Sequence, residues 1–86
     1  MKQYDITIIG SGLRSTTLAS QLGDSYRILL VDKNKTDLQH IKNQNIEQIH
    51  ATQYRNCIKN DQGYTVVLHK DRKNILICTK VLIQAD

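Results

Sequence analysis

A glycine-rich turn between an apolar run and a helical stripe constrains the fold of this chain more than any other feature. Residues 4–9 form a β-rich run that ends at Gly10, and residues 27–31 form a second apolar run that ends at Asp32. Between them, four residues with helical spacing predict a helix closed by Gly23, namely Ser15, Leu18, Ala19 and Leu22. The pattern predicts a strand, a helix and a strand, with strands buried on both faces as in a parallel sheet.

The remainder of the chain predicts a short helix and several more strands. A second helix of about two turns is predicted from Thr36, Asp37, Leu38, Ile41 and Lys42. Residues 46–51 read as a third strand. From Tyr54 the period changes to two, and polar turns at residues 60–63 and 71–74 predict an antiparallel meander. Residues 80–85 carry a last aliphatic run, which predicts one more central strand.

These elements predict one α/β domain that spans residues 1–86, with a Rossmann-like parallel sheet of strand order 3-2-1-4. Right-handed crossovers place both predicted helices on one face of the sheet, so we expect the β-meander to cover the other face. The sequence contains no proline, and it shows no repeat and no low-complexity stretch that would mark a boundary between domains.

The turn after the first strand has the composition of a site for a diphosphate. Gly10 allows a tight turn out of the strand, and Gly12 lets the backbone approach a diphosphate at the start of the helix. Free main-chain amides and the helix dipole favour an anion there. Arg14 lies in the first helical turn, where it could reach a phosphate or simply face solvent. The candidate cofactor-binding residues are Gly10, Ser11, Gly12, Leu13, Arg14, Ser15, Asp32 and Lys33.

The end of the second predicted strand bears on the choice of dinucleotide. Asp32 follows Gly12 by twenty residues, where its carboxylate can accept hydrogen bonds from ribose hydroxyls. Lys33 and Lys35 could pair with the 2′-phosphate of NADP, but Asp32 would repel that phosphate by about 1 kcal/mol or more. The sequence therefore favours NAD over NADP.

Residues 4–32, YDITIIGSGLRSTTLASQLGDSYRILLVD, resemble the nucleotide-binding motif of the pyridine nucleotide-disulfide oxidoreductase (flavoprotein) superfamily. Residues 46–85 look like the third strand, meander and fourth parallel strand of the NAD-binding domain of that superfamily. The opening YDITIIGSG looks more like its FAD-binding domain, so the resemblance implies NAD or FAD as the cofactor. It also implies electron transfer between a nicotinamide and a flavin. Ser15 departs from the motif because it stands where the motif has its third glycine or an alanine.

Several other functions are not favoured by the residue pattern. The net charge of +4 comes from basic residues scattered among aspartates, which does not indicate nucleic-acid binding. No run reaches the roughly 20 apolar residues of a membrane span, and no signal peptide is evident, so we expect a cytoplasmic protein. The three histidines and two cysteines show no metal spacing, and no catalytic motif is present.

The chain is therefore expected to lack catalysis by itself and to be a fragment or an accessory subunit. Another chain, another domain or a second copy would then cover the edges of the small sheet. Two alternatives remain open. The first is a nucleotide-sensing regulatory domain similar to those that gate potassium transport, and the second is a degenerate Rossmann domain kept for protein contacts.

Overall fold

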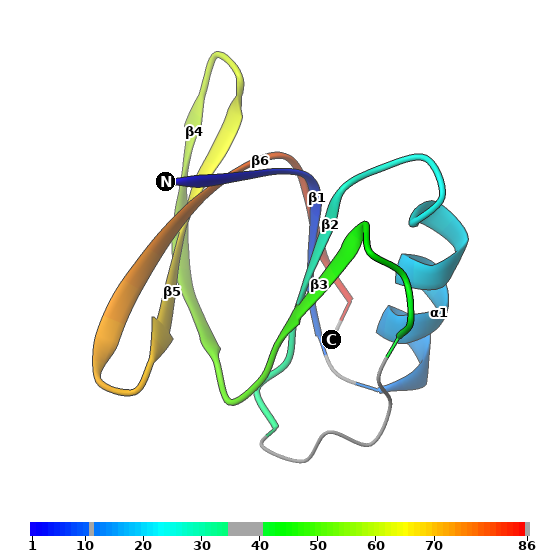
Figure 1. Cartoon of the computed structure of the whole chain (residues 1–86). Coiled ribbons are helices and arrows are strands. Elements are labelled where there is room, and N and C mark those ends of the chain that lie inside the picture. Colours follow the sequence, from blue (N-terminus) through cyan, green and yellow to red (C-terminus); the bar gives the residue numbers. More distant parts are fainter. Residues whose placement is uncertain (11, 35–40, 86) are drawn as a thin grey trace.

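The computed structural model describes residues 1–10, 12–34 and 41–85, and these ranges contain six β-strands and one α-helix. In chain order the elements are β1 (Lys2–Ile9), α1 (Leu13–Leu22), β2 (Ile28–Val31), β3 (Ile46–Ile49), β4 (Gln53–Asn60), β5 (Gly63–Lys70) and β6 (Lys73–Gln84). All six strands belong to one sheet with the order β3-β2-β1-β6-β5-β4 (Figure 1).

The sheet is mixed, with a parallel half and an antiparallel half. β1 pairs in parallel with β2 on one side and with β6 on the other, and β2 pairs in parallel with β3. At the centre of this half, Ile8 lies between Leu30 and Ile83. β5 pairs antiparallel with both β6 and β4, so the second half is a meander.

The predicted Rossmann-like α/β fold with two helices on one face is wrong. The described residues are mostly in strands, and they contain one short helix, α1. Most of the second predicted helix, residues 36–40, lies outside the described residues, and Ile41 and Lys42 are not helical. The meander is also not a separate layer, because its strands extend the same sheet.

The length of β6 explains why the meander joins the sheet. The sequence predicts a meander strand and then a separate parallel strand at residues 80–85, but both belong to the twelve-residue strand β6. Thr79 pairs with Tyr64 of β5 and, on its other side, with Tyr4 of β1. Because the same residues hydrogen-bond in both directions, one strand connects the two halves and no turn separates them.

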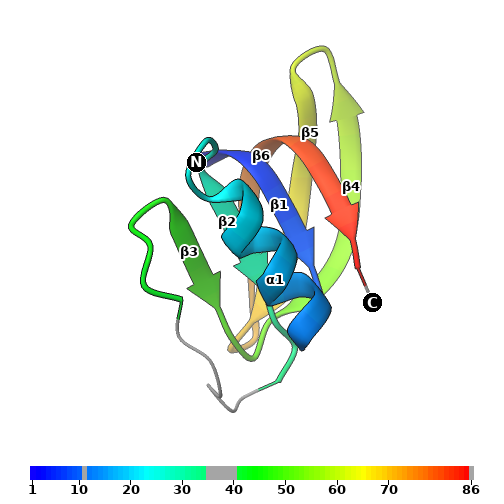
Figure 2. The ribbon, with the colours of Figure 1, turned by 90° about the vertical axis from the view of Figure 1, so that its right-hand side faces the viewer.

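The core is divided into two clusters by the sheet. Figure 2 shows α1 across the strands of the parallel half, where the buried residues are Ile6, Ile8, Ala19, Ile28, Leu30 and Ile46. On the other face, Val66 and Leu68 of β5 belong to the same buried cluster as Ile9 and Leu29. The sheet is therefore curled, so that the meander packs back over the face that α1 does not cover.

The link between β3 and β4 also follows this curl. These two strands lie at opposite edges of the sheet, yet residues 50–52 alone connect them. Thr52 is buried, and its amide donates to the carbonyl of Asp32 at 3.0 Å. The first residues of β4 are therefore held beside the end of β2.

Candidate functional site

The turn between β1 and α1 contains Gly12, one of the residues that the sequence predicts to contact a diphosphate. Gly12, with φ 97° and ψ −169°, immediately precedes α1. Residues that carry a side chain rarely adopt this backbone conformation, so the position favours glycine. A Cβ atom built on Gly12 would meet nothing within 4 Å, so the space beside it is open. Among the described residues no side chain caps α1, and its first turn holds no acidic residue, which leaves its amides available to an anion.

The other predicted residues of this turn differ in their surroundings. Leu13 is 71% exposed, and Arg14 also faces solvent. Ser15 is fully buried, and its hydroxyl has no hydrogen-bond partner among the described residues. A serine therefore fits at this position without contacting solvent. Burial of its hydroxyl without a hydrogen bond lowers the stability of the folded chain. Ser11 lies outside the described residues.

Asp32 stands at the end of β2 and is half-buried. One oxygen of its carboxylate accepts a hydrogen bond from the amide of Asn34 at 2.8 Å. Its other oxygen lies 3.5 Å from Nδ1 of His50, which follows β3. A carboxylate has about four acceptor positions, so a ribose hydroxyl could still bind Asp32 in addition to these neighbours.

Main-chain hydrogen bonds fix the strand ends around Asp32. The Asp32 amide donates to the carbonyl of Ile49 at 2.9 Å, and the amide of Ala51 donates to the carbonyl of Asn34 at 2.9 Å. On the other side, the Gly10 amide donates to the carbonyl of Val31 at 3.0 Å. Main-chain hydrogen bonds therefore connect the carboxyl ends of β1, β2 and β3, and a ligand could bind at this edge of the sheet.

A pocket of about 300 Å³ opens at this edge. It is lined by Ile9, Gly10, Val31, Lys33, Thr52, Gln53, Tyr54 and Gln84. Of the predicted site residues, Gly10 and Lys33 line the pocket. Ligands of open α/β sheets bind at the carboxyl ends of parallel strands, and the pocket occupies the corresponding position here.

Sequence reasoning did not find the residues that the meander contributes to this pocket. Thr52, Gln53 and Tyr54 reach it because the sheet curls, and no local motif indicates a curl. A hydrogen bond with Cys57, followed by burial, raises the pKa of the Tyr54 hydroxyl. Tyr54 is therefore a neutral side chain at physiological pH, with a ring beside the pocket.

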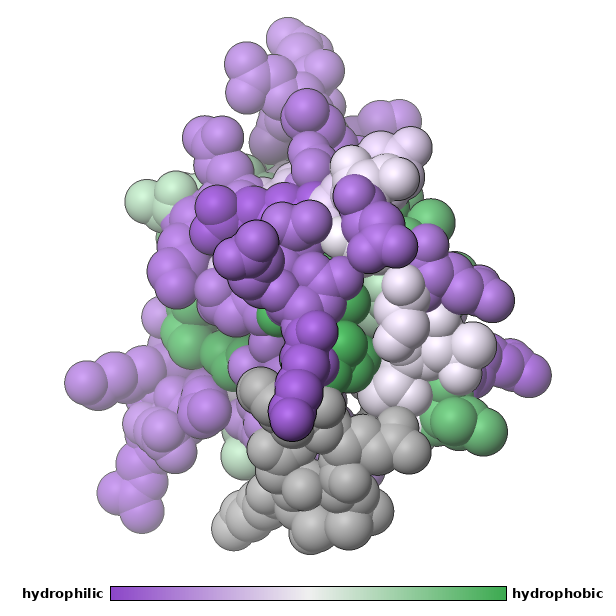
Figure 3. Space-filling view, turned by 45° about the vertical axis from the view of Figure 1, so that its right-hand side comes forward, coloured by the Kyte–Doolittle hydropathy of each residue, from purple (hydrophilic) through white to green (hydrophobic). Residues whose placement is uncertain are grey.

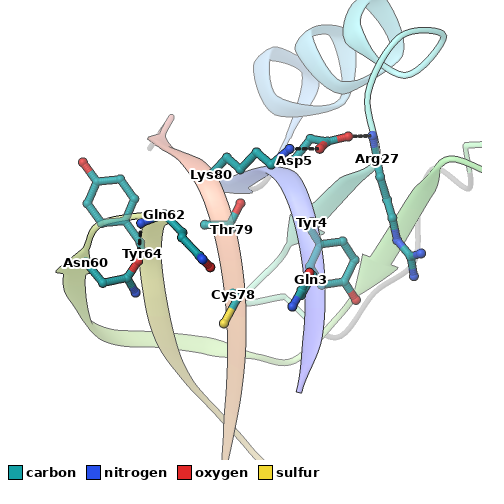
Figure 4. A pocket seen from close by; sticks show the side chains of 10 residues that line it. All are labelled: Gln3, Tyr4, Asp5, Arg27, Asn60, Gln62, Tyr64, Cys78, Thr79 and Lys80. Carbon is teal, nitrogen blue, oxygen red and sulfur yellow. Dashed lines mark hydrogen bonds and ion pairs between the residues drawn. The ribbon is translucent and has the colours of Figure 1, made fainter.

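A larger cavity of about 500 Å³ lies at the other end of β1 (Figure 4). Its lining is Gln3, Tyr4, Asp5, Arg27, Asn60, Gln62, Tyr64, Cys78, Thr79 and Lys80. The main-chain amide of Arg27 donates to Asp5 at 2.9 Å and holds the pKa of that carboxyl below its usual value, while Lys80 lies 3.6 Å from Asp5 and adds to the effect. None of the residues that the sequence predicts to bind a cofactor lines this cavity.

The described part of the chain holds no cluster of three or more His, Cys, Asp or Glu residues that could bind a metal ion. His40 lies outside that part. The described residues also include no helix of the length and apolar character needed to span a membrane.

Comparison with known proteins finds a similar fold among solved structures. No protein-family model and no curated protein matches the sequence. Among solved structures, the L-proline dehydrogenase from P. horikoshii has a similar fold, with a TM-score of 0.84 and 19% sequence identity. The match covers 96% of this chain and 22% of that chain. The chain therefore spans about a fifth of the length of that protein, and the two have a similar fold over this part.

Proposed function

We propose that this chain binds a dinucleotide, NAD or FAD, and supplies the nucleotide-binding part of an oxidoreductase. The observation that carries the proposal is the open space beside Gly12, at the start of α1, which no side chain among the described residues caps. A diphosphate there would accept hydrogen bonds from main-chain amides that no described side chain caps. The similarity to part of a dehydrogenase agrees with this function at the level of the fold.

The adenosine half of the ligand would extend from the turn toward the end of β2. Asp32 would accept hydrogen bonds from the ribose, and the neighbouring 300 Å³ pocket would hold the adenine beside Lys33 and Tyr54. The redox half would project from the chain toward residues supplied by another domain or another chain. Catalysis would therefore require that partner.

Titration calorimetry with NADH, NADPH, FAD and ADP tests the proposal directly. We expect heat with ADP and with at least one dinucleotide. No heat with any of the four would reject the proposal and favour a domain kept for protein contacts.

Gly12→Val should abolish binding, because the branched side chain would occupy the space beside the turn. The positive φ of Gly12 also makes any side chain costly by roughly 1–3 kcal/mol, so circular dichroism must first show that the variant is folded. Leu13→Ala is the matched control, because it removes an exposed side chain and keeps the main-chain amide. A folded Gly12→Val variant with the affinity of the parent would place the diphosphate elsewhere.

Asp32→Ala should weaken NAD binding more than NADP binding. The variant loses a ribose acceptor in both cases, but for NADP it also removes a charge that repels the 2′-phosphate, an effect of about 1 kcal/mol or roughly fivefold in affinity. Asp24→Ala, which removes an exposed carboxylate after α1, serves as the control. Equal losses for the two nucleotides would mean that Asp32 does not face the ribose.

A further inference from the structure

Two glutamines reach the 300 Å³ pocket from opposite sides of β1. Gln84, near the end of β6, pairs with Ile9 at the end of β1. Gln53 begins β4 and follows Thr52, whose amide donates to the carbonyl of Asp32 at the end of β2. Since β6 and β2 lie on either side of β1, the two side chains line the pocket from two directions.

The side-chain amides of Gln53 and Gln84 are available to a ligand. Both residues are exposed, and neither side chain has a hydrogen bond to another residue in the described part of the chain. The hydroxyl of Thr52, in contrast, already donates to the carbonyl of His50 at 2.8 Å. Among the described lining residues, Lys33 carries the one charge and none is a carboxylate. The pocket therefore offers two neutral amides to a polar ligand.

Two carboxamides suit the donors and acceptors of adenine. A carboxamide has a carbonyl that accepts and an amino group that donates, so it can pair with a neighbouring donor and acceptor of a base. Adenine has an amino group, N6, between the ring acceptors N1 and N7. Each hydrogen of N6 can bond to one glutamine carbonyl, while the glutamine amides donate to N1 and N7. Guanine and hypoxanthine have a carbonyl oxygen in place of N6, so the glutamine at N7 would face two acceptors and lose a hydrogen bond.

We propose that Gln53 and Gln84 make the pocket specific for adenine by pairing with the two sides of its amino group. This inference rests on the proposed dinucleotide function and names the residues that recognise the base. Ile9 and the ring of Tyr54 would contact the face of the base, but such contacts do not distinguish adenine from guanine. The hydroxyl of Tyr54 is hydrogen-bonded with Cys57. The choice of base therefore depends on the two amides.

An apolar ligand or an apolar protein partner agrees less well with these observations. On the side of the molecule drawn in Figure 3 the surface is mostly hydrophilic, and apolar side chains appear in separate patches. A partner that binds through apolar side chains needs a continuous apolar area. In the pocket, an apolar ligand would cover the amides of Gln53 and Gln84 and leave them without hydrogen bonds, which lowers affinity.

Titration calorimetry with ADP, inosine diphosphate and GDP tests this specificity. The three nucleotides share the ribose and the diphosphate, so differences in affinity report the base alone. We expect ADP to bind about tenfold or more tightly than inosine diphosphate, whose base is hypoxanthine, and than GDP. Equal affinity for ADP and inosine diphosphate would overturn the inference and leave dinucleotide binding intact. No binding of any of the three would reject the proposed function as well.

Substitution of the two glutamines tests their assignment. Gln53→Leu and Gln84→Leu remove the amides at nearly constant volume, and each should weaken ADP binding by about fivefold or more. The double variant should lose the preference for ADP over inosine diphosphate. Gln3→Leu is the matched control, because Gln3 is an exposed glutamine of β1 outside this pocket. A folded double variant that keeps the preference, or an equal loss in Gln3→Leu, would overturn the assignment.

A modified nucleotide tests the same contact without a change in the protein. The 7-deaza analogue of ADP has a carbon in place of N7 and therefore cannot accept a hydrogen bond there. We expect the parent chain to bind this analogue about fivefold or more weakly than ADP. An analogue that binds as tightly as ADP would overturn the proposed pairing at N7.

Discussion

The parallel and the antiparallel halves of the sheet use glycine in different ways. In the parallel half, Gly12 has a positive φ, and open space surrounds the position of its missing Cβ. In the antiparallel half, Gly63 also has a positive φ, but a Cβ there would collide with the carbonyl oxygen of Thr79 and lie 2.8 Å from the Cα of Lys80. The fold itself therefore requires Gly63, whereas the space beside Gly12 is available to a ligand.

The largest expected effect comes from a side chain at the packed glycine. Gly63→Ala should destabilise the chain by about 3 kcal/mol or more, because backbone strain is added to a clash with the main chain of β6. Gly12→Ala should cost only the strain, roughly 1–2 kcal/mol, since its methyl group meets no neighbour. Urea denaturation of both variants measures the difference. Equal costs would remove the distinction between the two glycines.

The parallel half could be predicted from the sequence better than the meander. The apolar runs of β1 and β2 and the stripe that includes Leu18 and Leu22 are local patterns, and the structure contains β1, α1 and β2 where those patterns lie. The turns that precede Gly63 and surround Arg72 are also local signals, and both turns occur. Where each of these elements lies along the chain follows from residues close together in sequence.

The arrangement of the meander could not be predicted, because it depends on contacts between distant residues. The sequence around Thr79 does not show that it will pair with both β1 and β5. The glycine turn after β1 was predicted because its residues, like those of β1, are close together in sequence. The pocket residues Gln53 and Tyr54 were missed. They reach the pocket only because the sheet curls, and a curl is a property of the whole sheet.

A second expected effect concerns a contact that crosses the parallel half. The hydroxyl of Tyr4 donates a hydrogen bond to Glu47 at 2.8 Å, which ties β1 to β3 across β2. Burial, followed by the hydrogen bond and the charge of Glu47, raises the pKa of Tyr4 from 10.0 to about 12, although Arg27 acts in the opposite direction. The folded chain therefore holds this proton more tightly than the unfolded chain does.

This contact should make the parent chain lose stability in alkali. The contribution is complete below pH 10, the pKa of the unfolded chain, and disappears as the pH rises through about 12. The loss should reach roughly 3 kcal/mol, and it should be absent in Tyr4→Phe. Urea denaturation across this pH range measures it, with Tyr26→Phe as the control at an exposed tyrosine. The same alkaline loss in Tyr4→Phe would show that other groups cause it.

The smallest effect should be a gain in stability, at the other turn of the meander. Asp71 and Arg72 both have positive φ, 53° and 66°, in the two-residue turn between β5 and β6. Hairpins of this type prefer glycine at the second position, so Arg72→Gly should stabilise the chain by about 0.5–1 kcal/mol. Arg72→Ala keeps the Cβ and removes the charge next to Lys70 and Lys73, so it separates relief of backbone strain from relief of charge repulsion. Urea denaturation measures both variants. If Arg72→Ala stabilises the chain as much as Arg72→Gly, relief of charge repulsion causes the gain. In that case the turn at Arg72 does not require glycine, and Gly63 is the position in the meander that does.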